Sequence, residues 1–160
     1  MKHSVLLDTS FFIRLLNPDD PLHKNTLGYF QYYLEKDHPL ICSTISIAEY
    51  CVRGKFDELP WRNLRVLPFN ANHAIRAGEL AEIVFRKKDK LFLQNRNVIP
   101  NDSKLFAQSD AESTIKEFVT SDVKCQNIID IIKEETPLSF KVVSIRRPFS
   151  ETYGVLDFGE

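Results

Sequence analysis

Short apolar runs alternate along the chain with longer stretches in which apolar residues recur every three or four positions. Short apolar runs bounded by polar or turn-forming residues are typical of buried strands, and the longer recurrence is typical of one face of a helix. The pattern predicts strands at residues 3–7, 40–42, 65–69, 117–121 and 140–145. It predicts helices at residues 9–16, 22–36, 43–54, 71–87, 101–113 and 124–135. This alternation indicates βαβ units, so we expect an α/β fold, a three-layer sandwich with a central, mostly parallel sheet.

Several residues suggest where these elements begin and end. Thr9 or Ser10 can cap the first helix, and Gly54 is expected as the C-cap of the third. Pro68 cannot donate a hydrogen bond to a central ladder, so the strand at 65–69 is expected near an edge of the sheet. Residues 88–100 are expected to form a polar connection.

The length and composition favour one domain. The chain has 160 residues, 43% of them hydrophobic, which is enough for one sizeable core. We expect that domain to span residues 1–145, followed by a C-terminal tail at 146–160. The tail has no helical period and contains Pro148 and two glycines, so its order can depend on a partner. No apolar run approaches the roughly 20 residues that span a bilayer, and we expect a cytoplasmic protein that does not bind membranes.

Four acidic residues stand where short apolar runs stop or predicted helices begin: Asp8, Glu49, Asp102 and Asp122. In an open parallel sheet the carboxyl ends of the strands form one edge, so carboxylates from distant segments can converge there. Converging carboxylates repel one another unless a cation lies among them, and an all-oxygen ligand set favours a hard ion. The sequence therefore predicts a site for Mg²⁺ or Mn²⁺.

Each of these carboxylates also has a purely structural interpretation. Asp8, Asp102 and Asp122 could act only as N-caps, because aspartate is common where a helix follows a strand or a turn. Glu49 could be a solvated helix residue, although Ile47 and Ala48 place it beside an apolar face.

The order of these motifs resembles a known family. The segments Val5-Leu6-Leu7-Asp8-Thr9-Ser10, Ser46-Ile47-Ala48-Glu49-Tyr50, Asp102 at a helix start, and Val119-Thr120-Ser121-Asp122 are similar to the PIN-domain ribonucleases, particularly the VapC-type toxins of prokaryotic toxin–antitoxin pairs. The resemblance covers residues 3 to about 145. It implies a small α/β nuclease that uses Mg²⁺ or Mn²⁺ to cleave single-stranded or looped RNA, a cognate antitoxin and a homodimer.

The resemblance also implies roles for individual residues. Asp8 and Asp122 would be the most direct metal ligands, while Asp102 and Glu49 would bind through water or orient the attacking water. The hydroxyls next to these positions could hold the carboxylates or contact a phosphate; they belong to Thr9, Thr120 and Ser121. A metal ion held by carboxylates can activate water and stabilise the charge of a phosphodiester transition state.

The chain departs from the family in three places. Phe106 follows Leu105 in the Asp102 helix, where many members have a small or aliphatic residue. The Val123-Lys124-Cys125 stretch lacks the acidic–aromatic pair often found after the last aspartate, which puts a further metal ligand in doubt. The connection before Asp102 is long and basic. It could be a substrate-specific insertion or merely a surface loop.

The overall charge argues against binding nucleic acid through bulk electrostatics. The formal net charge is -1, so any contact with RNA needs a local patch. Lys87, Lys88 and Arg96 are candidates, although cations are also common at solvated helix ends. Cys42, Cys51 and Cys125 are odd in number and lack Cys-x-x-Cys spacing, so reduced structural thiols are expected.

The helix at 22–36 carries more aromatic residues than one buried face requires. Phe30 and Tyr33 are expected in the core, and Tyr29 or Tyr32 could serve the interface of a homodimer.

Two other classes of protein compete with an active nuclease. A phosphoacceptor receiver domain also gathers aspartates at strand ends, but Asp8 has no acidic neighbour and Lys141 lies inside the last apolar run. The alternative that the sequence leaves open is a catalytically degenerate PIN fold that binds RNA or a protein without cutting. Four retained acids favour an occupied metal site, because an empty cluster would destabilise the fold.

Overall fold

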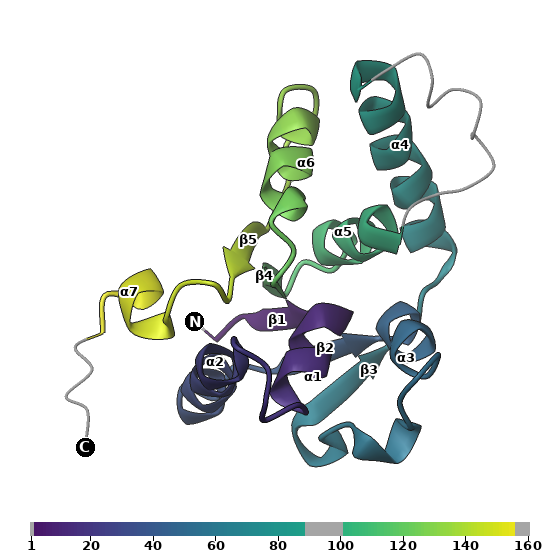
Figure 1. Ribbon diagram of the computed structural model, residues 1–160. Coiled ribbons are helices and arrows are strands. Elements are labelled where there is room, and N and C mark those ends of the chain that lie inside the picture. The colour runs from purple at the N-terminus through teal and green to yellow at the C-terminus, as the bar shows by residue number, and fades with distance from the viewer. Residues whose placement is uncertain (1, 89–100, 156–160) are drawn as a thin grey trace.

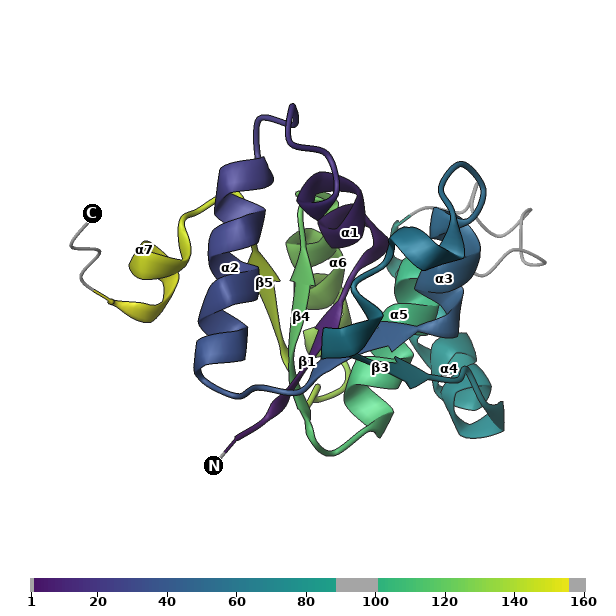
Figure 2. The same cartoon turned by 90° about the horizontal axis from the view of Figure 1, so that it is seen from below.

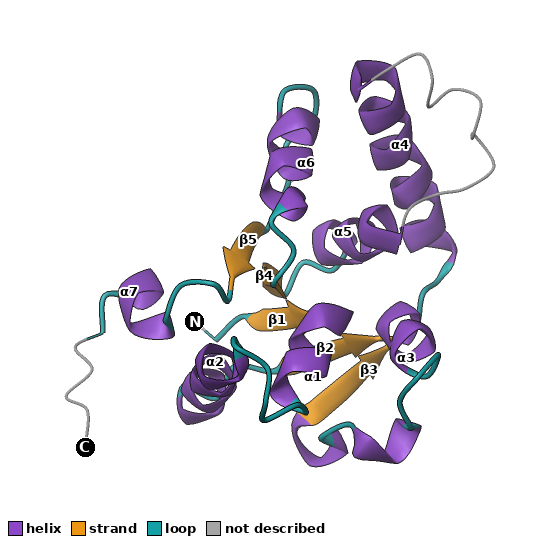
Figure 3. Cartoon of the chain, in the orientation of Figure 1, coloured by secondary structure: helices purple, strands orange, loops and turns teal. Residues whose placement is uncertain are grey.

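The structure is a computed structural model that describes residues 2–88 and 101–155. Its centre is a five-stranded sheet in the order β3-β2-β1-β4-β5, and every pair of neighbours is parallel (Figures 1 and 3). The strands are β1 (Ser4–Leu7), β2 (Leu40–Ser43), β3 (Leu64–Leu67), β4 (Ile115–Thr120) and β5 (Lys141–Ser144). The predicted α/β sandwich is confirmed, and β3 lies at an edge as Pro68 indicated.

Helices cover both faces of the sheet. On one face lie α1 (Thr9–Leu15), α2 (His23–Glu35) and α7 (Phe149–Tyr153), and on the other α4 (Ala71–Lys88), α5 (Asn101–Ala111) and α6 (Lys124–Lys133) (Figures 1 and 2). The short helix α3 (Thr44–Tyr50) follows β2, and two 3₁₀ turns at Phe56–Glu58 and Trp61–Asn63 lead to β3. In the described part of the chain, no helix is long and apolar enough to cross a membrane.

The core has two parts because strand side chains alternate between the faces. Val5 and Leu7 of β1 join a cluster with α1 and α2, whereas Leu6 between them joins a cluster with α4, α5 and α6. All three are completely buried. A central parallel strand is covered on both faces, which explains why it is a continuous apolar run rather than an alternating one.

The strand order places a topological switch point beside β1. The chain leaves β1 toward β2 and β3 and later returns to β4 on the other side of β1. Connections therefore diverge at the carboxyl ends of β1 and β4, where open parallel sheets bind ligands. Asp8 follows β1 at this point, and its N–H donates to the carbonyl of Val119 in β4 at 2.9 Å.

Two predicted boundaries are wrong. The first helix is capped by Asp8 itself, whose side chain accepts from the Thr9 N–H, and not by Thr9 or Ser10. The third helix ends at Tyr50 rather than reaching Gly54. Gly54 closes the following turn by donating to the Tyr50 carbonyl at 2.9 Å, and a Cβ there would lie 2.4 Å from the Tyr50 ring. Glycine is therefore required at 54 for close packing.

The expectation of a tail without helical structure is also wrong. Residues Phe149–Tyr153 form α7, and the Tyr153 ring stacks on Tyr32 with centroids 4.5 Å apart. The Tyr153 hydroxyl donates to the buried Glu117 carboxylate at 2.6 Å, which ties α7 to β4. Tyr29 is fully buried and its hydroxyl bonds to Thr152 at 2.6 Å. The aromatic surplus of α2 therefore packs against α7 of the same chain, and it no longer argues for a homodimer.

Candidate metal centre

Asp8 is almost completely buried and still accepts three hydrogen bonds. The Thr9 N–H donates to Oδ1 at 2.8 Å, and the hydroxyls of Ser10 and Thr120 donate to Oδ2 at 2.7 and 2.8 Å. Only 7% of its surface is exposed. Burial raises the pKa of Asp8 although these hydrogen bonds favour the charged form. The carboxylate is thus held in one orientation at a position where a negative charge is unfavourable without a cation.

The same two hydroxyls fix the loop that carries Asp122. Thr120 Oγ1 accepts from the Asp122 N–H and Ser10 Oγ accepts from the Ser121 N–H, both at 3.0 Å. Each hydroxyl therefore donates to Asp8 and accepts from the loop after β4. The Asp122 side chain also accepts from the Lys124 N–H at 2.9 Å, as a capping aspartate would. Ser10 and Thr120 therefore hold the Asp8 carboxylate and the backbone of Asp122 in a fixed relative position.

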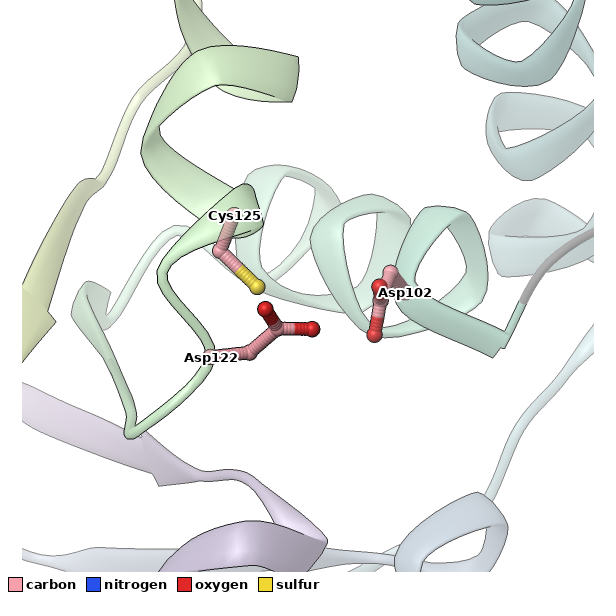
Figure 4. Close-up of side chains that lie close together, drawn as sticks. All are labelled: Asp102, Asp122 and Cys125. Carbon is pink, nitrogen blue, oxygen red and sulfur yellow. The ribbon is translucent and has the colours of Figure 1, made fainter.

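Asp102 faces this pair from the first turn of α5. Asp102, Asp122 and Cys125 each place one potential ligand atom within 4.8 Å of the others (Figure 4). Burial, and after it the carboxylates of Asp8, Asp122 and Glu49, together raise the pKa of Asp102 to about 6. The other three predicted acids therefore act electrostatically on Asp102, although only Asp122 joins it in the compact group with Cys125.

Glu49 approaches from α3. Thr9 donates from Oγ1 to Glu49 Oε1 at 3.2 Å, so the residue after Asp8 orients a second carboxylate. Burial raises the pKa of Glu49, and Asp8 raises it further. Among the described residues, no lysine or arginine forms an ion pair with any of the four acids. Among the described residues, Lys104 lowers the pKa of Glu49 without forming an ion pair, so the negative charge of the cluster is compensated only in small part.

The available donor atoms suit a hard divalent ion. Carboxylate oxygens are the preferred ligands of Mg²⁺ and Mn²⁺. Cys125 adds a sulfur atom, but burial and the nearby Asp102, Asp8 and Asp122 raise the pKa of its thiol. A neutral thiol is a poor ligand, so the oxygen atoms dominate. Cys42 and Cys51 are free thiols like Cys125.

The structure places Thr9, Thr120 and Ser121 in different surroundings. Thr9 bonds to Glu49 and Thr120 bonds to Asp8, whereas Ser121 Oγ accepts from Arg14 Nε at 2.8 Å. Sequence reasoning missed Ser10, although its position two residues after Asp8 at a helix start was a usable signal. It also missed Arg14. This residue pairs with Asp20 at 2.8 Å and donates to Ser121, so it holds the loop after β4 in place.

Among the three basic candidates, only Lys87 has a described side chain. Lys87 forms ion pairs with Glu134 and, at 3.7 Å, with Glu135, so its charge is already compensated by the end of α6. The side chain of Lys88 and the whole of Arg96 lie outside the described residues. Their role in binding RNA stays a prediction.

Comparisons with known proteins identify the fold. No protein-family model matches the chain, and no curated protein sequence matches it. A structure of VapBC2 from Rickettsia felis bound to a DNA fragment from their promoter is 21% identical with a TM-score of 0.52, and the match covers 86% of this chain and 97% of the other. The chain has a PIN-domain fold of the VapC type.

Two further structures agree. A DNA-bound VapBC from Salmonella typhimurium is 17% identical with a TM-score of 0.51, and the match covers 91% of this chain and 99% of the other. Mycobacterium tuberculosis VapC20, described as a Sarcin-Ricin loop cleaving toxin, is 17% identical with a TM-score of 0.53. The match covers 78% of this chain and 94% of the other. The predicted resemblance to the PIN domain is therefore confirmed at the level of the fold.

The stability of the protein without metal should fall as the pH rises. The pKa of Asp102 is about 6 in the folded chain against an ordinary 3.8, so the folded state binds the proton more tightly than the unfolded state. The resulting stabilisation is fully present below pH 3.8 and is lost as the pH passes through 6. In EDTA we expect the free energy of unfolding in urea to drop by about 1.5 kcal/mol from Asp102 between roughly pH 5 and 7.5. An increase over this range would contradict the repulsion between the acids.

Proposed function

We propose that this protein is a metal-dependent endoribonuclease that hydrolyses RNA phosphodiester bonds and is the toxin of a toxin–antitoxin pair. The observation that carries the proposal is that Asp8, Asp122 and Glu49 all raise the pKa of Asp102, while no lysine or arginine among the described residues forms an ion pair with any of the four acids. An electrostatically unfavourable cluster at the switch point of the sheet is expected where a cation binds. The VapC-type fold supports the same conclusion.

The four acids have distinct tasks in this proposal. Asp8 and Asp122 would hold Mg²⁺ or Mn²⁺ directly, and Glu49 and Asp102 would hold it through water or orient the attacking water. When bound, the ion supplies a water of lowered pKa and a positive charge for the phosphate. Thr120 fixes the relative orientation of the two direct ligands because it bonds to Asp8 and to the Asp122 N–H.

The partners follow from the fold and stay predictions. The similar structures include toxin–antitoxin complexes named VapBC, so we propose a cognate antitoxin for this chain. We also propose a cytoplasmic protein and a homodimer. Because α7 covers the aromatic residues of α2, the surfaces that would meet in the homodimer lie elsewhere. A monomer by light scattering at tens of micromolar would argue against the dimer.

Cleavage of RNA tests the proposal directly. The purified protein is incubated with total cellular RNA and with structured RNAs that contain exposed loops, in millimolar Mn²⁺ or Mg²⁺. We expect discrete fragments, and we expect EDTA to stop their formation because the ion supplies the nucleophile. Metal binding without cleavage across these RNAs would favour a catalytically degenerate PIN domain that binds RNA or protein.

A further inference from the structure

Two grooves border the acidic centre, one on each side. The first has a volume of about 660 Å³ and contains Glu49 in its wall, and the second has a volume of about 500 Å³ and contains Asp122. Both volumes lie within the roughly 300–1,000 Å³ of ordinary ligand sites. A nucleic acid strand whose phosphate lies at the acids would have to leave the centre along such a groove.

The first groove is poorly suited to a phosphate backbone. It contains a second carboxylate, Glu58, and one cation, Arg53. Its walls include Ile13 and Val52, and the exposed fraction of Val52 is 78%. Two carboxylates against one arginine leave the groove acidic, and an acidic groove repels phosphates.

The second groove has the opposite charge. It is lined by residues of β5, α6 and α7, and it contains Lys141 and Arg147. Figure 1 shows β5 at the edge of the sheet. Among the described residues, the only carboxylate that lines this groove is that of Asp122, which belongs to the acidic centre itself. A cationic groove that is continuous with a metal-binding acid matches the charge pattern of a phosphodiester strand.

The two cations of this groove differ in how far neighbouring carboxylates compensate their charge. Lys141 Nζ lies 3.4 Å from Glu117 and 5.8 Å from the centre of the Tyr153 ring, so part of its charge is compensated. Arg147 has no carboxylate within ion-pair distance among the described residues. Its chain position is fixed by Arg146, which donates from Nε to the Ser121 carbonyl at 2.8 Å beside Asp122. Arg147 is therefore an uncompensated guanidinium held near the acidic centre.

We propose that single-stranded RNA leaves the acidic centre past Asp122 along the outer edge of β5, with Arg147 binding a phosphate next to the scissile bond. Arginine suits this task because its guanidinium can donate two parallel hydrogen bonds to one phosphate. The inference rests on the proposed ribonuclease function and names the binding track of the same site.

The experiment compares arginines from the two grooves. Arg147→Gln and Arg53→Gln are each made in an Asp102→Asn background, and the dissociation constant for a labelled single-stranded RNA is measured by fluorescence anisotropy over a range of salt concentrations. We expect Arg147→Gln to weaken binding about tenfold and to reduce the salt slope by about 0.7, as for one lost phosphate contact. We expect Arg53→Gln to change neither quantity. Arg147→Lys should restore part of the affinity because it keeps the charge.

Cleavage kinetics separate this inference from the proposed function. In the otherwise unchanged protein we expect Arg147→Gln to raise KM about tenfold with kcat unchanged, because the contact is made equally in the ground and transition states. Absence of cleavage by the parent protein would overturn the ribonuclease function. Cleavage by the parent with equal effects of both arginines, or no effect of Arg147→Gln, would overturn the RNA track alone and favour a polypeptide strand at the exposed edge of β5. A single-stranded DNA of the same sequence tests whether the track also uses the ribose hydroxyls.

Discussion

We expect Asp102→Asn to reduce RNA cleavage by about a thousandfold and, at the same time, to make the metal-free protein more stable. The loss of activity follows because asparagine keeps the shape of the side chain but removes one of four charges that bind the ion and orient water. The gain in stability follows because burial disfavours the charge of Asp102 and because Asp8, Asp122 and Glu49 repel it. At about pH 7.5 in EDTA the gain in the free energy of unfolding should be about 2 kcal/mol.

The opposite directions of the two effects make this variant informative. A substitution that merely damages the fold lowers both activity and stability, whereas removal of a repelled catalytic charge lowers only activity. Asp130→Asn is the matched control, because Asp130 is an exposed aspartate of α6 that accepts a hydrogen bond from Gln126 at 2.8 Å. It should leave both cleavage and stability unchanged. Full activity of Asp102→Asn would exclude Asp102 from the catalytic set.

The sequence predicts the sheet well because the strands carry their signal locally. Val5, Leu6 and Leu7 form an unbroken apolar run, and the structure buries all three between two layers of helices. The strand at 65–69 was placed near an edge from Pro68 alone, and β3 is an edge strand. Such features depend on neighbouring residues, and no knowledge of distant contacts is needed to interpret them.

The tail shows what local patterns cannot predict. Five residues are too few for a helical period, and α7 is held by contacts with residues more than a hundred positions earlier, such as the stack of Tyr153 on Tyr32. The end of α3 was also misplaced, because the residues after Tyr50 form turns in which Gly54 donates to the Tyr50 carbonyl. In α7 tertiary contacts overrode a weak local preference, whereas at α3 the error is one of a helix boundary.

The candidate site likewise contains some residues that the sequence predicts and others that it does not. Asp8, Asp102 and Asp122 stand beside strand ends or helix starts, so a shared site could be suggested before any contact was known, whereas Glu49 lies near the end of α3. Ser10 looked like an ordinary cap, and its dual bond to Asp8 and to the Ser121 N–H depends on β4 lying beside β1. Lys87 was a candidate for binding RNA, but it pairs with Glu134 and Glu135, which directly follow the carboxyl end of α6. Proximity of a basic residue to the site cannot be derived from a charge run.

We expect millimolar Mn²⁺ or Mg²⁺ to stabilise the protein, and Asp8→Asn to abolish that effect. Binding to the folded state alone adds about 3 kcal/mol to the free energy of unfolding when the ion is at a hundred times its dissociation constant. Asparagine caps a helix about as well as aspartate, so the variant should keep the bond from the Thr9 N–H and remain folded. It loses the charge that the ion requires, together with the oxygen that accepts from the Ser10 and Thr120 hydroxyls.

A salt control separates binding from screening, because any electrolyte weakens the repulsion between four carboxylates. Unfolding in urea is therefore compared in Mn²⁺, in Mg²⁺ and in NaCl of equal ionic strength. A specific site predicts that the divalent ions stabilise the parent protein well beyond NaCl, while Asp8→Asn responds equally to all three. Asp130→Asn should behave like the parent because its carboxylate lies outside the cluster. If NaCl stabilises the parent as much as Mn²⁺ does, the acids are screened rather than bound to an ion, and the metal centre is excluded.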